Sequence, residues 1–303
     1  MICGDITNKN VFDELKVKSD NKIDFLIATP PCQGVSIAGK NKENKDMVTD
    51  PRNMLIFKVI EFIYLKNPDY ILIENVPRYL SLNLIYQNDL INIKDILHKE
   101  LSLKYNIEID IMDASVLNVA QYRKRAIIRI YKKNLKWDPP TENKKITIRD
   151  SISHLPSLES GEHSKLKWHF ARKHSDKHIL WMQNTPTGKS AFENEIYYPK
   201  KENGEIIKGY NTTYRRMEWD KPAPTITMRN DAISSQKNVH PGTLLENGLY
   251  SDARVLTPLE LMILSSIPKT LKIPDDTSEI LIRQILGECV PPMMIKKIAE
   301  GII

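Results

Sequence analysis

Short apolar runs alternate with helical patterns along the first 135 residues of the chain. Residues 23–28 (IDFLIA) end abruptly at two prolines, which predicts a buried strand that meets a loop. Residues 70–73 form a second such run, and further strands are predicted at 107–112 and 126–131. Strands that alternate with helices predict an α/β fold, with a mostly parallel sheet that helices cover on both faces.

Helices are predicted between these strands. Asp50 and Pro51 suit the N-cap and first position of a helix that runs through Leu65, and a second helix is predicted over 91–104. The apolar residues of the first helix recur at helical spacing: Leu55, Val59, Phe62 and Ile63. Such alternation favours ligand binding beyond the carboxyl ends of the strands.

The pattern changes after the last predicted strand. Residues 132–250 are polar and have little periodicity, which predicts either a long irregular insertion or a small second lobe. Helical order returns at 257–260 (TPLE), which has the form of a capping box. A further helix is predicted from about 278 to 286, where Gly287 stops it, and a last one within 293–303.

Composition narrows the class of protein. With 303 residues, 41% of them hydrophobic and 27% charged, the chain is typical of a globular protein with one large domain or two lobes. Lys and Arg exceed Asp and Glu by 44 − 38 = 6, a mild excess that is compatible with a polyanionic partner. Three scattered cysteines argue against a disulfide framework and favour the reducing cytoplasm.

Residues 161–178 form a basic stretch with five Lys or Arg against two acidic residues. Trp168 and Phe170 lie within it, a mixture that suits phosphate contact with ring stacking, although an ordinary solvated loop has equal weight. Its four histidines fit no common zinc pattern, so no metal site is predicted. The candidate nucleic-acid contacts of this stretch are Lys165, Lys167, Arg172 and Lys173.

Two residues at predicted strand ends are candidates for chemistry. A cysteine is usually a buried small apolar residue, but Cys32 follows two prolines in a loop, where free N–H groups can lower its pKa and make it a nucleophile. Glu74 ends another strand and is either a surface carboxylate or a buried one with a raised pKa. Together they would form a nucleophile and acid pair.

At these residues the sequence resembles the DNA (cytosine-5) methyltransferases of bacterial restriction–modification systems. Five blocks match in the order of that family, and together they cover most of the chain. They are 29–36 (TPPCQGVS), 50–55 (DPRNML), 74–76 (ENV), 121–125 (QYRKR), and 254–260 (RVLTPLE) paired with 287–292 (GECVPP).

The resemblance implies a Rossmann-like catalytic domain, from 1–131 plus 278–303, and a smaller, irregular target-recognition domain over 132–277. It also implies that a cytosine is flipped out of duplex DNA, because its ring atoms are unreachable inside the stack. Cys32 would attack C6, Glu74 would donate a proton at N3, and C5 would take a methyl group from S-adenosylmethionine. Fixed positive charge near the nucleotide would come from Arg123 and Arg125, whose alternative is a pair of strand-edge salt bridges.

The resemblance further implies the contacts to cofactor and partners. Gln33 and Ser36 would join the basic stretch as DNA contacts, and a cognate restriction endonuclease is an expected partner. The residues expected to hold S-adenosylmethionine are Asp5, Ile6, Pro31, Leu55 and Val290.

The start of the chain departs from the family pattern. The Phe-x-Gly-x-Gly loop and the acidic residue that ends the second strand are both missing, and residues 1–6 (MICGDI) resemble the third block. Glu288 also replaces the usual Asn. The sheet is therefore expected to be truncated at its N-terminal side. Three explanations stay open: a split enzyme completed by a second polypeptide, a fragment of a longer gene product, and a decayed copy.

Three other functions compete with a methyltransferase. A non-catalytic DNA-binding remnant would not require Cys32, Glu74 and the two arginines. A thiol hydrolase would need a histidine base, but His98 falls in a predicted helix and none lies at a strand end. An RNA-directed relative is not favoured by any feature of the sequence.

Overall fold

The computed structural model describes residues 1–19, 22–31, 48, 50–274 and 276–303, which form two compact units. Unit 1 consists of Met1–Asp113, Lys124–Pro139 and Gly301–Ile303, and unit 2 of Ala114–Arg123 and Pro140–Glu300. The roles expected for 1–131 with 278–303 and for 132–277 stay predictions. Among the described residues, no helix has both the length and the apolar composition that crossing a membrane requires.

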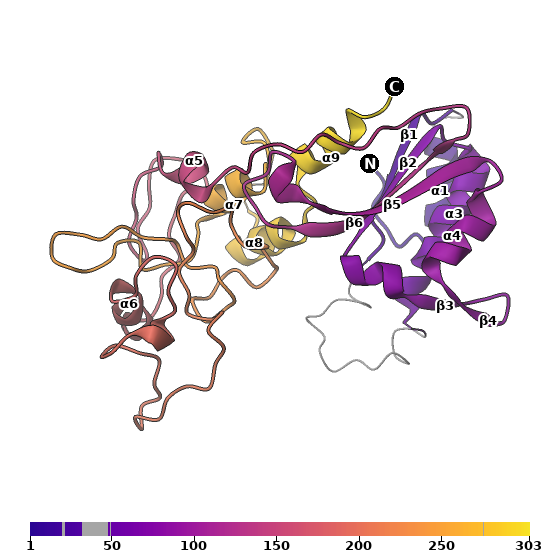
Figure 1. Cartoon of the computed structure of the whole chain (residues 1–303). Coiled ribbons are helices and arrows are strands. Elements are labelled where there is room, and N and C mark those ends of the chain that lie inside the picture. Colours follow the sequence, from indigo (N-terminus) through magenta and orange to yellow (C-terminus); the bar gives the residue numbers. More distant parts are fainter. Residues whose placement is uncertain (20–21, 32–47, 49, 275) are drawn as a thin grey trace. The chain divides into compact units, whose positions relative to one another are not determined.

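Unit 1 contains a mixed four-stranded sheet in the order β1-β2-β6-β5 (Figure 1). The predicted strands are confirmed as β1 (Phe25–Ala28), β2 (Tyr70–Asn75), β5 (Tyr105–Asp113) and β6 (Lys124–Lys132). The expectation of a mostly parallel sheet is wrong, because β1 and β2 pair in parallel whereas β6 runs antiparallel to both of its neighbours. Residues 114–123 alone join β5 to β6, too short a connection for the crossover that a parallel pair needs.

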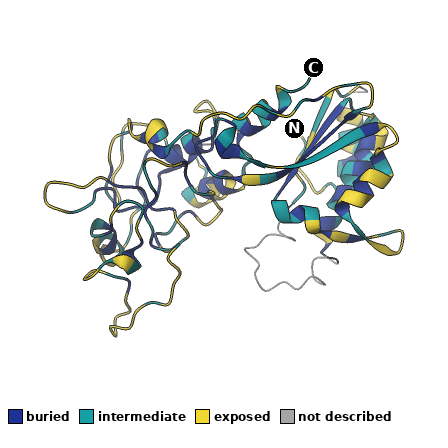
Figure 2. Cartoon of the chain, in the orientation of Figure 1, coloured by how far each residue is buried: buried dark blue, intermediate teal, exposed yellow. Residues whose placement is uncertain are grey.

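Three helices of unit 1 lie together on one face of this sheet (Figures 1 and 2). They are α1 (Lys9–Lys18), α3 (Leu55–Lys66) and α4 (Ile93–Leu101). α1 joins the layer through Phe12, whose ring meets that of Phe62 edge-on at 6.4 Å. The core between α3, α4 and the sheet is aliphatic and includes Ile56, Ile60, Ile63, Ile71, Ile73, Ile96, Leu97, Leu101, Ile128 and Ile130.

The helix predicted after Asp50 is confirmed, with a different first turn. The Asp50 carboxylate caps a 3-10 turn, η2 (Pro51–Met54), and α3 follows directly. The buried stripe of α3 is Ile56, Ile60 and Ile63, at the i, i+4, i+7 spacing of a helix face, with Phe62 beside it. The expected stripe is therefore partly wrong, since Leu55 and Val59 are only half-buried.

The other face of the sheet carries aromatic and charged residues within unit 1. Trp137 packs edge-on against Phe25, Tyr70 and Tyr131, with ring centroids 5.7, 5.6 and 6.4 Å apart. Farther along this face, buried Arg129 pairs with Glu108 and Asp110. The expected helical cover on both faces is thus wrong for the described part of unit 1, whose helices cover only one face.

A two-stranded hairpin before α4 was not predicted. It pairs β3 (Asn83–Tyr86) with β4 (Asp89–Asn92), and a short 3-10 turn, η3 (Pro77–Ser81), precedes it. Its two-residue turn, Gln87-Asn88, has positive φ at both positions, as a type I′ turn requires. The pair Gln-Asn is a weaker turn signal than Asn-Gly, which is why the sequence pattern missed it.

Unit 2 is mostly irregular chain, as the polar composition of 132–250 predicts. Its regular elements are η4 (Ala114–Val116), α5 (Ile148–Ile152), α6 (Asp176–Gln183), η5 (Ala191–Glu193), α7 (Pro258–Leu264), α8 (Glu279–Glu288) and α9 (Pro292–Ala299). The capping box at the start of α7 is confirmed, with reciprocal bonds between Thr257 and Glu260. α8 runs through Gly287 rather than stopping there.

Buried arginines hold the irregular segments of unit 2 together. Arg216, Arg254 and Arg283 are each at most 1% exposed. Arg216 donates to the carbonyl oxygens of Met182, His240 and Asp252. Because a guanidinium carries five donors and irregular chain leaves many carbonyls without ladder partners, one arginine can satisfy several segments at once.

Candidate active site

Glu74 and Arg125 form a buried ion pair in unit 1. Glu74 lies near the carboxyl end of β2 and Arg125 near the start of β6, where the antiparallel register pairs Asn75 with Ala126. The Nε of Arg125 lies 2.9 Å from Oε1 of Glu74, and the two side chains are 13% and 8% exposed. Of the two expectations for Glu74, burial is confirmed and a surface carboxylate is wrong.

The neighbouring Asn75 ties this strand end to the predicted nucleophile loop. Its Nδ2 donates to the carbonyl oxygen of Pro30 at 3.0 Å, and its Oδ1 accepts from the N–H of Val76 at 2.9 Å. The ends of β1 and β2 therefore lie side by side, as their parallel pairing requires. Sequence reasoning did not identify Asn75 as this tether, although its place in the Glu-Asn-Val block is a signal.

Three expected site residues, Cys32, Gln33 and Ser36, lie outside the described residues. Their roles stay predictions. The described chain reaches half-buried Pro31 and, apart from residue 48, resumes at Asp50, whose carboxylate binds Arg52 at 2.6 Å.

Arg123 belongs to unit 2 and binds main-chain carbonyl groups there. It is 3% exposed and donates to the oxygens of Ile226 at 2.9 Å, Gly287 at 3.3 Å and Glu288 at 3.4 Å. These contacts join two distant segments, at 226 and at 287–288, to the Gln-x-Arg block. They give Arg123 an organising role that its sequence position did not reveal, and its contact with a nucleotide stays a prediction.

The residues expected to hold the cofactor have chemistry that suits adenosine. Asp5 is exposed, and the N–H and hydroxyl of Thr7 each donate to its carboxylate at 2.8 Å and lower its pKa. An ionised carboxylate can accept from an exocyclic amino group. Ile6, Pro31 and Leu55 offer half-buried apolar surface. Val290 is half-buried in unit 2 and lines an apolar pocket of about 230 Å³ together with Pro268, Pro292 and several aliphatic residues.

The three lysines expected to contact DNA, Lys165, Lys167 and Lys173, are all exposed, as is Lys177 of the same stretch. Arg172 instead is half-buried and pairs with Glu279 at 3.3 Å. The two aromatic residues have partners within the stretch: the Lys167 ammonium lies 5.2 Å from the Trp168 ring, and Phe170 stacks on His163. Among the described residues, no group of three His, Cys, Asp or Glu side chains could hold a metal ion.

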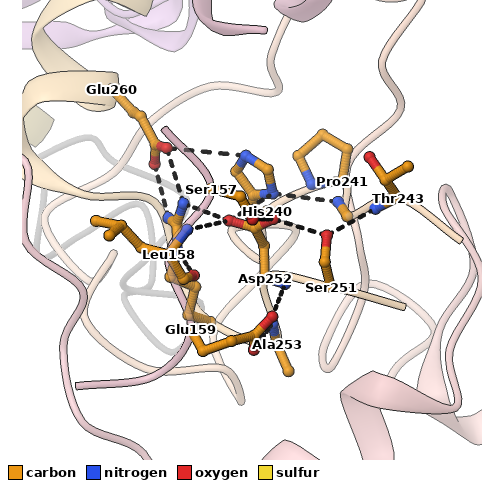
Figure 3. Close-up of polar contacts among 12 residues, drawn as sticks. Ser157, Leu158, Glu159, His240, Pro241, Thr243, Ser251, Asp252, Ala253 and Glu260 are labelled. Atoms are coloured by element: carbon orange, nitrogen blue, oxygen red, sulfur yellow. Dashed lines mark hydrogen bonds and ion pairs between the residues drawn. The ribbon is translucent and has the colours of Figure 1, made fainter. Parts of the chain in front are cut away.

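A buried charge network lies beneath the irregular chain of unit 2, where Asp252, Glu260 and His240 converge (Figure 3). Arg254 bridges the two carboxylates, with nitrogen–oxygen distances of 2.7 Å to Asp252 and 2.9 Å to Glu260. The His240 ring nitrogens lie 3.8 Å from each carboxylate. The sequence marked Arg254 and Glu260 as a block but gave no sign of their partners.

Burial and charge shift the pKa values of this network. Burial, reinforced by Arg254, lowers the pKa of His240 to about 4, so the ring is neutral at pH 7. Although burial opposes ionisation of Glu260, Arg254 lowers the pKa of that carboxyl group to about 2. The pKa of Asp252 is likewise well below its ordinary value, through its charged neighbours and the hydroxyls of Ser157 and Ser251. The network is therefore stable as two carboxylates, one guanidinium and a neutral ring.

The sequence is similar to methyltransferases along its whole length. The chain is 54% identical over 303 residues to Type II methyltransferase M1.HgaI of Avibacterium volantium, covering all of this chain and 85% of that protein. It is 28% identical to Type II methyltransferase M1.HphI of Haemophilus parahaemolyticus, over 99% of this chain and 73% of that one. Both relatives are named as Type II methyltransferases.

A solved structure shows that the fold is shared. A prophage-encoded methyltransferase structure from E. coli matches with a TM-score of 0.67 at 18% identity, over 98% of this chain and 84% of that one. The α/β methyltransferase fold is thereby confirmed. The model of the family described as C-5 cytosine-specific DNA methylase matches residues 1–303. The chain therefore belongs to the C-5 cytosine-specific DNA methylase family and is a DNA (cytosine-5) methyltransferase.

Proposed function

We propose that the enzyme uses S-adenosylmethionine to methylate C5 of a flipped cytosine in a specific duplex sequence, through a covalent adduct with Cys32, as part of a restriction–modification system. The observation that carries the proposal is the buried Glu74–Arg125 pair, 2.9 Å apart. It lies at the strand end that Asn75 ties to Pro30, two positions before Cys32.

Cys32 acts first in the proposed reaction. Its thiolate attacks C6 of the cytosine and forms a C6–S bond. Glu74, which must first take up a proton from solvent, gives that proton to N3, so that negative charge does not accumulate on the ring. C5 thereby becomes nucleophilic. After C5 is methylated, loss of its proton and β-elimination break the C6–S bond and free Cys32. Arg125 holds the Glu74 carboxyl group in place throughout.

S-adenosylmethionine, when bound, supplies the methyl group as an electrophile. Asp5 is the proposed acceptor for its adenine amino group, and Ile6, Pro31 and Leu55 provide apolar surface for the ring. Val290 is proposed as a further contact. These assignments rest on the family motifs and on the accessible, ionised carboxylate of Asp5.

The proposed partners are duplex DNA, a cognate restriction endonuclease and, for the sheet, a further strand. Lys165, Lys167 and Lys173 are proposed phosphate contacts, because all three are exposed in one basic stretch. β1 pairs with β2 along one edge, and no other described strand lies along its second edge. A strand from a second polypeptide would fit there. The cytoplasmic location expected from the scattered cysteines is part of the same proposal.

Trapping of the covalent intermediate tests this proposal. In duplex DNA with 5-fluorocytosine, C5 carries fluorine in place of the proton that β-elimination must remove. The enzyme and S-adenosylmethionine should therefore form an adduct that survives denaturing electrophoresis. We expect Cys32→Ser to form none and Cys289→Ser to form it as the unaltered chain does. An adduct with Cys32→Ser would overturn the assignment of the nucleophile. If the unaltered chain binds DNA but forms no adduct, either alone or with a polypeptide that supplies a further strand, a DNA-binding remnant is the better description.

A further inference from the structure

A basic groove of about 700 Å³ lies within unit 2, apart from the basic stretch 161–178. We use the name basic groove for the hollow lined by Tyr122, Arg215, Glu218, Lys221, Thr225 and Lys237, with the chain between them. Its volume is that of a site for a ligand much larger than one phosphate ion. Residues from three separate segments of the chain meet in it.

Positive charge dominates the groove. Arg215, Lys221 and Lys237 line it against one carboxylate, Glu218. Lys221 pairs with Glu218 at 2.8 Å, and Arg215 pairs with Glu193 at 3.1 Å. Exposed pairs of this kind are weak, so a phosphate can replace the carboxylate. Within the described part of the chain, no carboxylate lies within ion-pair distance of the exposed Lys237 ammonium group.

One wall of the groove is continuous with the Gln-x-Arg block. Tyr122 lies between Gln121 and Arg123, its N–H donates to Ala223 at 2.7 Å, and its carbonyl oxygen accepts from the Thr225 hydroxyl at 2.7 Å. The ammonium group of Lys145 lies 4.9 Å from the Tyr122 ring and adds a further cation beside the groove. The wall formed by Tyr122 is therefore fixed to the segment of Ala223 and Thr225, which follows Lys221 in the chain.

We infer that the basic groove binds the sugar–phosphate backbone of the duplex DNA substrate, with Arg215, Lys221 and Lys237 as phosphate contacts. Several cations around one open groove match the repeated charge of a nucleic-acid backbone better than a single small anion. Arg216 also lines the groove, but its donors are bound to main-chain carbonyls, so it shapes the floor. The inference rests on the proposed function and adds a DNA-binding site that the sequence did not indicate.

Salt-dependent DNA binding tests the groove. The probe is a fluorescein-labelled random-sequence DNA duplex, titrated with the full chain at several salt concentrations. Each phosphate contact contributes about 0.9 to the slope of log K against log salt, so Lys237→Gln and Arg215→Gln should each lower the slope by about that amount. Lys18→Gln removes the same charge from exposed Lys18 of α1 and should leave the slope unaltered. At position 237, which has a φ of 48°, glutamine removes the charge and keeps an unbranched polar side chain.

The outcomes separate the groove from the proposed function. Variants that methylate DNA and bind it with an unaltered salt slope would overturn the inference that the groove binds DNA, but not the proposed methyltransferase reaction. An unaltered chain that neither binds nor methylates DNA would overturn both. A duplex RNA of the same sequence serves as a further probe: slopes that fall for RNA alone would overturn the assignment to DNA.

Discussion

At the scale of single residues, strand pairing fixes the position of Glu74. Glu74 and Arg125 come from neighbouring antiparallel strands, and their side chains share one face of the sheet. Since a buried carboxylate is costly without a partner, the pair keeps the acid in place before any substrate binds. Asn75 adds the second constraint, because it holds Pro30 beside the same strand end.

Replacing the acid should therefore separate chemistry from binding. In Glu74→Gln the amide keeps the shape of the side chain but cannot supply the proton. We expect methyl transfer to fall by about a hundredfold to ten-thousandfold, the usual contribution of a general acid, with DNA affinity unaltered. Radiolabel transfer and fluorescence anisotropy measure the two quantities.

Glu108→Gln is the matched control. Glu108 also pairs with an arginine of β6, Arg129, on the same sheet, but its side chain is 40% exposed. This variant should retain the unaltered rate. Equal rates of methyl transfer in Glu74→Gln and Glu108→Gln would show that Glu74 is not the general acid.

The sequence predicted Glu74 but not most of its surroundings. A carboxylate after four apolar residues is visible as a strand-end residue, and so its burial could be anticipated. The contacts of Arg123 could not, because Ile226 and Gly287 lie more than a hundred positions away. Long-range contacts of this kind depend on how irregular segments pack, which local pattern does not encode.

At the scale of elements, apolar runs located strands better than they fixed strand direction. All four strands of the sheet were predicted, since each carries a run of aliphatic residues. The direction of β6 depends instead on its short connection to β5, a constraint outside the strand itself. The hairpin β3–β4 was missed because its strands are short and half-exposed and its Gln-Asn turn is a weak signal.

Gly287 illustrates a similar error at the end of α8. A glycine near a helix end usually stops the helix, but here it lies in the last turn. A Cβ at this position would lie 2.3 Å from the carbonyl carbon of Thr227 and 2.4 Å from the backbone nitrogen of Met228. The glycine therefore allows α8 to approach another main-chain segment closely.

Gly287→Ala should destabilise unit 2. The added methyl group meets backbone atoms, which cannot rotate away, so we expect a loss of about 3 kcal/mol in the free energy of unfolding. Denaturant titration measures it. Gly248→Asn is the control, because its Cβ has open space and Asn tolerates the positive φ of 80° there. A Gly287→Ala protein as stable as the unaltered chain would contradict the close approach.

At the scale of the whole molecule, the two units stabilise their backbones differently. Unit 1 pairs its polar groups in strands and helices over an aliphatic core. Unit 2 has few regular elements and depends on buried arginines and on the network around Arg254. Because those charges are buried, the stability of unit 2 should depend on pH more strongly than it would if the same groups were exposed.

The stability of the chain should fall in mild acid. His240 has a pKa of about 4 when folded, below the value of about 6.5 expected when unfolded. The neutral His240 ring thus makes its full contribution to the free energy of unfolding above pH 6.5. This contribution is lost as the pH falls from 6.5 towards 4. The groups that face it are Asp252, Glu260, Arg254 and Arg216, and the two carboxylates extend the loss to lower pH.

His240→Asn isolates the histidine part of this effect. Asn can accept the bond that the N–H of Gly242 donates to the ring at 3.1 Å, but it does not titrate. We expect the fall in unfolding free energy between pH 6.5 and 4 to shrink by about 2–3 kcal/mol. The part of the fall that is due to His174 should remain, because burial lowers the pKa of that ring to about 4 as well. The same pH dependence in both proteins would contradict a buried neutral His240.

Methyl transfer by the purified 303-residue chain tests the central claim most directly. The chain is incubated with labelled S-adenosylmethionine and unmethylated DNA, and the modified base is identified by mass spectrometry. We predict 5-methylcytosine, made by the chain alone or with a polypeptide that supplies a further strand, and none with Cys32→Ser. Label on another base, transfer that survives Cys32→Ser, or no transfer under either condition would contradict the account.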